Sequence, residues 1–178
     1  LGGLGSNIAM YLARAGVGHL HLVDFDKVDI TNLNRQQYDI ADLGTLKTDA
    51  LTKNIKRFNP FIEITSQCVK VNEDNAAEIF GGYKIVCEAF DKAENKAMLV
   101  NSILSECGDT KIVSGSGMAG FGSSNTIVTR KINDRFYLCG DAESDMNDGL
   151  ALAAPRVAIC AAHEANMILR LLIGEKEV

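Results

Sequence analysis

The sequence predicts an α/β fold, with a mostly parallel sheet flanked by helices and a C-terminal antiparallel strand pair. Short apolar runs of β-favouring residues at 19–25, 84–90 and 111–114 alternate with amphipathic helical segments, which is typical of βαβ units. A glycine-rich turn opens the first helix, and no internal repeat or low-complexity linker divides the chain. A length of 178 residues suits one domain, so residues 1–178 are expected to fold as a single unit.

The chain begins with Leu1-Gly2-Gly3-Leu4-Gly5, followed by an apolar helix and a strand that ends near Asp24. This order fits most of the G-x-G-x-x-G nucleotide fingerprint, with Gly2 and Gly5 in its second and third positions. The first glycine, and the strand that feeds the loop, are therefore expected upstream of Leu1. Asp24 follows Gly2 by 22 residues, close to the spacing of about 20 for an acid that binds ribose. The pattern predicts a Rossmann-like nucleotide site.

The remaining elements are predicted from periodicity and from the positions of glycine and proline. The polar segment 26–42 is long for a connection, and loops of that length tend to be functional. The strand at 84–90 is expected to carry Asp91 at its C-terminal end. We expect helices at 6–15, 48–58, 75–80, 94–107 and 155–173, a further strand at 61–71, a strand pair at 125–130 and 135–138, a glycine-rich loop at 115–122 and an acidic loop at 139–149.

Composition narrows the function classes. The net charge of −5 disfavours a nucleic-acid partner, which usually requires a basic surface. No run reaches the 18 apolar residues of a membrane span, so we expect no membrane partner. Five cysteines without any C-x-x-C pair argue against structural zinc and for a reducing, cytoplasmic location.

Six short motifs give the chain a family resemblance through their order and spacing. They are Gly-Gly-Leu-Gly-Ser (2–6), Val-Asp-Phe-Asp (23–26), Asn-Leu-Asn-Arg-Gln (32–36), Gly-Thr-Leu-Lys (44–47), Asn-Pro (59–60) and Phe-Asp (90–91). Together they resemble the ThiF/MoeB superfamily, the bacterial relatives of ubiquitin-activating enzymes. Residues 149–157, Gly-Leu-Ala-Leu-Ala-Ala-Pro-Arg-Val, more specifically resemble short, zinc-free ThiF-like proteins of thiamine biosynthesis.

The resemblance implies an adenylyltransferase that uses ATP and Mg²⁺. Its substrate would be the C-terminal glycine carboxylate of a small ubiquitin-like sulfur carrier of the ThiS type, with a Gly-Gly C-terminus, and the enzyme would be a homodimer. A carboxylate that attacks a phosphate needs cations to neutralise charge in the transition state. The resemblance assigns this catalytic role to Arg35 and Lys47 at the ATP phosphates, and to Asp91 as the magnesium ligand.

The other nucleotide contacts are implied in the same way. Asp24 would hold the ribose hydroxyls, and Asn32 would lie beside the nucleotide. Asp26 is either a second nucleotide contact or a turn former. The glycine turn would let the nucleotide approach the backbone closely, through Gly2, Gly3 and Gly5.

Several alternatives remain at this point. Arg35 and Lys47 could be surface cations, and Asp91 could be an N-cap. Cys139 fits a packed thiol better than a covalent link to the carrier, and the histidines fit packing better than catalysis. The acidic loop 141–148 is a solvated surface or a lid over the carrier's tail. Competing functions are a MoaD-type carrier as substrate, a tRNA-modifying dehydratase, or an NAD-binding Rossmann protein.

Overall fold

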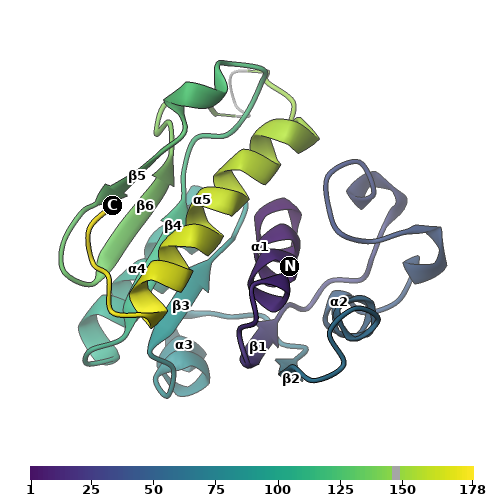
Figure 1. Ribbon diagram of the computed structural model, residues 1–178, viewed down its shortest axis with the longest axis horizontal. Helices are drawn as coiled ribbons and strands as arrows, with labels where there is room; N and C mark the ends of the chain where they lie inside the picture. The colour runs from purple at the N-terminus through teal and green to yellow at the C-terminus, as the bar shows by residue number, and fades with distance from the viewer. Residues whose placement is uncertain (146–148) are drawn as a thin grey trace.

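The computed structural model describes residues 1–145 and 149–178 (Figure 1). The predicted alternation of strands and helices is confirmed, with bounds that differ from the expected ones by a few residues. The helices are α1 (Gly3–Arg14), α2 (Lys47–Lys56), α3 (Glu73–Phe80), α4 (Ala93–Glu106) and α5 (Ala154–Leu172), with short 3-10 turns at Ile30–Asn32, Ile40–Asp42 and Ser124–Thr126. The strands are β1 (His19–Val23), β2 (Glu63–Gln67), β3 (Ile85–Glu88), β4 (Lys111–Gly115), β5 (Val128–Lys131) and β6 (Phe136–Gly140).

The strands of the described residues form two sheets. Strands β1 and β2 pair in parallel, and the second sheet has the order β3-β4-β6-β5. Within it, β3, β4 and β6 run parallel, whereas β5 pairs antiparallel with β6. The predicted C-terminal antiparallel pair is therefore present, and it continues the parallel sheet through β6.

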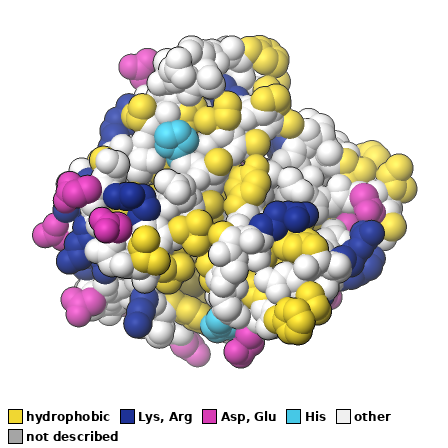
Figure 2. Space-filling model, in the orientation of Figure 1, with side chains coloured by type: hydrophobic (Ala, Val, Ile, Leu, Met, Phe, Trp, Pro, Cys, Tyr) yellow, Lys and Arg dark blue, Asp and Glu magenta, His cyan; other side chains and the backbone are white. Residues whose placement is uncertain are grey.

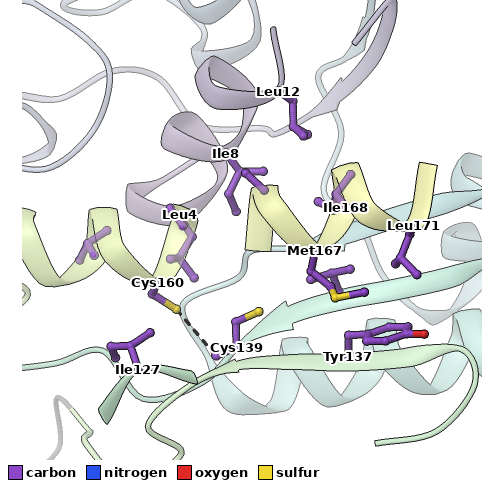
Figure 3. Close-up of a cluster of buried hydrophobic side chains, with 14 residues drawn as sticks. Leu4, Ile8, Leu12, Ile127, Tyr137, Cys139, Cys160, Met167, Ile168 and Leu171 are labelled. Carbon is purple, nitrogen blue, oxygen red and sulfur yellow. Dashed lines mark hydrogen bonds between the residues drawn. The ribbon is translucent and has the colours of Figure 1, made fainter. Parts of the chain in front are cut away.

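Helix α1 joins the two halves of the molecule, because its opposite faces contribute to different cores. Ile8 and Leu12 pack with α5 and the second sheet, whereas Ala9 and Ala13 pack with α2 and β1. Figure 3 shows Ile8 and Leu12 directed toward the α5 side chains, above Tyr137 of β6. A third core lies between α3, α4 and the β3–β4 edge. Burial on both faces holds the N-terminus of α1 in a fixed position between the sheets.

The acidic loop was predicted as a solvated surface, and the structure contradicts this at Asp141. Its side chain is mostly buried and forms an ion pair with Arg156, the first-turn arginine of α5. Arg156 also donates hydrogen bonds to the backbone carbonyls of Gly122 and Ser123, so it ties the glycine-rich loop to α5. Residues 146–148 of the predicted acidic loop lie outside the described residues, and the lid remains a prediction.

Candidate active site

The N-terminus of α1 lies at the centre of the predicted site. Gly2 is the N-cap residue, and no side chain caps this end of the helix. A Cβ atom on Gly2 would have only the Gln36 side chain nearby, at 3.8 Å, so the backbone here is open to close approach. The unpaired N–H groups and dipole of such a helix end favour an anion.

The two other glycines provide close packing around this helix end. A Cβ atom on Gly3 would lie 3.1 Å from Val157 of α5 and 3.6 Å from the stem of Arg35. A Cβ atom on Gly5 would lie 3.4 Å from Ala89, in the turn after β3. The first turn of α1 therefore touches both the segment that carries Arg35 and the turn that leads to Asp91.

Asp24 directly follows β1. One of its oxygens accepts a hydrogen bond from the backbone N–H of Asp26 at 2.8 Å. The ammonium of Lys47 lies close enough to favour the charged form of this carboxyl group. A hydrogen-bond acceptor thus stands at the carboxyl end of a parallel strand, where α/β sheets bind ligands.

Lys47 lies within the same group of charges. Its ammonium is 2.9 Å from the carboxylate of Asp26, and its side chain is 7% exposed against 49% for Asp26. The backbone N–H of Lys47 also donates to the Asp26 carbonyl. A cation in the first turn of a helix opposes the dipole, and Asp26 supplies the anion that offsets it. Asp26 therefore acts as an ion-pair partner, a role the sequence did not indicate.

Arg35 and Asn32 lie on the segment between β1 and α2. Asn32 is engaged locally, since its side-chain oxygen accepts a hydrogen bond from the N–H of Asp29 and caps a 3-10 turn. The Arg35 guanidinium donates to the Thr31 carbonyl and the Asn34 side chain. Its Nε atom is buried and has no hydrogen-bond partner in the described part of the chain. Arg35 thus lies beside the glycine turn with an unused donor.

Asp91 is exposed in the turn between β3 and α4. Its turn contacts the α1 end through Ala89, but in the part of the chain that the structure describes no hydrogen bond or ion pair joins Asp91 to Arg35 or Lys47. Among the described residues, no group of three or more histidine, cysteine or acidic side chains is arranged to hold a metal. Magnesium commonly takes one or two carboxylates together with substrate phosphates, so one accessible aspartate fits a nucleotide-bound ion.

A buried polar cluster behind this turn was not predicted from the sequence. Glu88 on β3 and Glu164 on α5 are both fully buried, and Lys96 of α4 lies 3.1 Å from the Glu88 carboxylate. Burial raises the pKa of Glu164 to about 8, and the charge of Glu88 adds to this shift while Lys96 opposes it. The signal was available in the sequence, because acids stand inside an apolar strand and an alanine-rich helix.

Cys139, Cys160, His21 and His163 pack against other side chains, as the sequence favoured, whereas Cys68 and His19 are exposed. Cys139 is fully buried, and burial together with Glu164 raises its pKa to about 12, so it is not a ready nucleophile. In Figure 3 the Cys160 thiol points to the Cys139 carbonyl within the core. His21 stacks on Tyr83 and contacts the hydroxyl of Thr65, and His163 contacts Thr129. None of these contacts links a histidine to the candidate site.

The parallel sheets and flanking helices, with an open helix end and a carboxylate directly after β1, define an α/β protein of the Rossmann type. The comparison with protein families is more specific, since the ThiF family matches residues 1–178. The chain belongs to the ThiF family.

In the described part of the chain, no helix is long and apolar enough to cross a membrane.

Curated relatives agree with this assignment. The chain is 37% identical over 118 residues to the adenylyltransferase and sulfurtransferase UBA4 of Eremothecium gossypii, covering 66% of this chain and 26% of that protein. It is 38% identical over 103 residues to the adenylyltransferase and sulfurtransferase MOCS3 of Caenorhabditis briggsae, covering 57% and 25%. The chain thus spans about a quarter of the length of these relatives.

Solved structures share the fold. The tRNA N6-threonylcarbamoyladenosine dehydratase TcdA of E. coli, in complex with ATP, superposes with a TM-score of 0.86 at 23% identity, over 97% of this chain and 82% of that chain. MccB of E. coli with ATP superposes with a TM-score of 0.73 at 20% identity, over 98% and 55%. At these identities the likeness establishes the architecture only.

Proposed function

We propose that this chain is an adenylyltransferase domain that activates a carboxylate with ATP. The observation that carries the proposal is the buried Lys47 ammonium, which pairs with Asp26 and acts on Asp24, the carboxylate that directly follows β1. The N-terminus of α1 is in addition uncapped and lined by glycine. Such an arrangement supplies fixed positive charge where a triphosphate would lie, and preorganised charge is the main requirement of phosphoryl and nucleotidyl transfer. The curated relatives named as adenylyltransferases support the same reaction class.

The reaction needs no protein nucleophile. An oxygen of the substrate carboxylate attacks the α-phosphorus of ATP, the bond from that phosphorus to the bridging oxygen breaks, and pyrophosphate leaves with the electron pair. The product is an acyl-adenylate. Lys47 and Arg35 would neutralise charge on the phosphates, and the N–H groups at Gly2 and Gly3 would add to this field. A magnesium ion held by Asp91 would shield the leaving pyrophosphate.

Asp24 would orient the nucleoside. Its ionised carboxylate accepts hydrogen bonds only, which suits the two donor hydroxyls of ribose. Asn32 would contribute a polar contact only after it releases its present capping bond. The thiol of Cys139 has no part in the reaction, because it is buried and protonated at neutral pH.

We propose a ThiS-type sulfur carrier of thiamine biosynthesis as the substrate, with a Gly-Gly C-terminus. The similarity of residues 149–157 to short ThiF-like proteins supports this choice. A MoaD-type carrier is the second candidate, because the relatives UBA4 and MOCS3 are also named sulfurtransferases. A tRNA substrate is the third, favoured by the fold shared with TcdA but disfavoured by the acidic charge of the chain.

Pyrophosphate exchange tests these candidates. The protein is incubated with ATP, Mg²⁺ and labelled pyrophosphate, with each carrier or with tRNA in parallel. A ThiS-type carrier should give exchange that disappears when its terminal glycine is removed. Exchange that depends only on a MoaD-type carrier, or only on tRNA, would identify that molecule as the substrate in place of the ThiS-type carrier. No exchange with any of them would overturn the adenylation proposal.

A nucleotide control separates this proposal from a dinucleotide-binding protein. ATP with Mg²⁺ should raise the melting temperature, whereas NAD should not, since only a ligand of the native state stabilises it.

The homodimer belongs to the same proposal, and light scattering tests it. Leu172 and Ile173 are exposed at the end of α5, and Figure 2 shows further hydrophobic side chains over α5 and toward α1, which is a surface a second copy could cover.

A further inference from the structure

Glu88 is an acid that the proposed chemistry does not use. It is fully buried at the end of β3, and its carboxylate accepts hydrogen bonds from three directions. The backbone N–H of Phe90 donates at 2.6 Å, the Lys96 ammonium reaches both oxygens at 3.1 and 3.2 Å, and the Ser114 hydroxyl donates from β4. A buried carboxylate is costly to retain unless its hydrogen bonds are met in this way.

These contacts close the turn that carries Asp91. Phe90 immediately precedes Asp91 in the sequence, and Lys96 lies in the first turns of α4, which begins two residues later at Ala93. Glu88 therefore accepts hydrogen bonds both from the turn, at the Phe90 N–H, and from helix α4, at the Lys96 ammonium. The same turn touches Gly5 through Ala89. The position of Asp91 relative to the α1 end is consequently set by a carboxylate that is inaccessible to solvent.

The neighbouring acid cannot replace it. Glu164 is also fully buried, but it accepts hydrogen bonds from the thiols of Cys87 and Cys160 rather than from the turn. With one ammonium shared by two buried acids, Glu88 forms the direct ion pair and Glu164 does not.

We infer that Glu88 is a positioning residue that fixes Asp91 for metal binding through the Phe90 N–H and Lys96. The inference rests on the proposed function, because it takes Asp91 as the ligand of a nucleotide-bound divalent cation. Groups that orient a metal ligand from behind typically change metal affinity by about ten- to a hundredfold when they are altered.

The variant Glu88→Gln tests it, because glutamine keeps the shape but has one acceptor oxygen where the carboxylate has two. Binding of Mn²⁺ with ATP, measured by water-proton relaxation, should weaken by about tenfold or more. Hydrogen–deuterium exchange of the metal-free protein should become faster over residues 89–92. Ser114→Ala is the matched control, because it removes the bond to β4 but leaves the bonds to the turn and α4, and it should change neither reading.

A double variant shows whether Glu88 acts through Asp91. In an Asp91→Asn background, the change Glu88→Gln should have no further effect on Mn²⁺ binding. If Glu88→Gln does not fold, Lys96→Gln tests the same clamp from α4 with the same expected results. Wild-type protein that fails to bind Mn²⁺ with ATP would overturn the proposed function. Wild-type binding, with Glu88→Gln unchanged in affinity and exchange, would overturn this inference alone.

Discussion

Two charged clusters lie at the ends of parallel strands in this molecule, and they differ in exposure. After β1, Lys47 pairs with Asp26, whose side chain is 49% exposed. After β3, Lys96 pairs with Glu88, whose side chain is fully buried. A partly exposed pair can exchange its partner for an incoming phosphate, whereas a buried pair holds its surroundings fixed. We therefore expect Lys47 of the exposed cluster to contact a ligand, and Glu88 and Lys96 of the buried cluster to position other residues that do so.

The largest effect is expected at Lys47. The change Lys47→Met keeps the apolar stem and removes the charge, so the ion pair is lost while most packing remains. Removing one preorganised electrostatic group from a transition state typically costs about 10²–10³ in rate. We expect pyrophosphate exchange to fall by that factor, measured at saturating ATP and carrier.

Lys53 is the matched control for this test. It lies on the same helix, its side chain is 63% exposed, and it pairs with the buried carboxylate of Asp42. Lys53→Met should leave the exchange rate within about twofold, because the Lys53 side chain lies largely in solvent and Asp42 keeps its hydrogen bonds from Asp39 and Asn54. If Lys47→Met and Lys53→Met behave alike, Lys47 is a structural cation and the first cluster has no ligand role.

The second effect concerns pH and the buried cluster. The pKa of Glu164 is raised from its ordinary 4.5 to about 8, so the folded protein holds a proton that the unfolded chain releases. Its contribution to stability is therefore complete below about pH 4.5 and declines as the pH rises toward 8. Each pH unit in this window corresponds to at most about 1.4 kcal/mol.

Glu164→Gln should remove this dependence, because glutamine stays neutral. Urea unfolding at pH 5, 6, 7 and 8 should show the variant gaining stability over the wild type, by a difference on the order of a few kcal/mol at pH 8. Glu175→Gln, just beyond α5 and exposed, should track the wild type throughout. Parallel curves for Glu164→Gln and wild type would show that Glu164 is ionised in the fold.

The fold could be predicted from the sequence because its signals are local. Apolar runs, glycines and Pro155 marked the strands and helix ends, and the six motifs placed Asp24 and Lys47 near the glycine turn. The partners of those side chains could not be predicted. Asp26 and Lys47 are distant in the sequence, and their contact depends on how the loop folds back between β1 and α2.

Glu88 was missed for a related reason. Periodicity assigns a strand residue to the interior, but it does not say that the interior contains a lysine and a serine from two other elements. Asp91, by contrast, was placed at a strand end by sequence alone, and its convergence with Arg35 and Lys47 around one triphosphate stays a prediction.

The smallest effect is expected at Asp26, for which the sequence left two roles open, a nucleotide contact or a turn former. The variant Asp26→Asn distinguishes between them. The Asp26 carboxylate is half exposed, so its ion pair with Lys47 is worth about 1 kcal/mol or less. Asp26→Asn should lower the free energy of unfolding by no more than that and change the apparent KM for ATP by less than about threefold, because Asp24 still lies near Lys47.

The same variant also tests partner exchange at the exposed cluster. If Lys47 leaves Asp26 when phosphate arrives, Asp26→Asn removes a competitor, and ATP should bind equally well or slightly more tightly. Isothermal titration of wild type and variant with ATP and Mg²⁺ measures this directly. A loss of tenfold or more in ATP affinity, without a loss of stability, would make Asp26 a direct nucleotide contact. Lys47 would then remain paired with Asp26 throughout binding, and the distinction drawn between the exposed and buried clusters would fail.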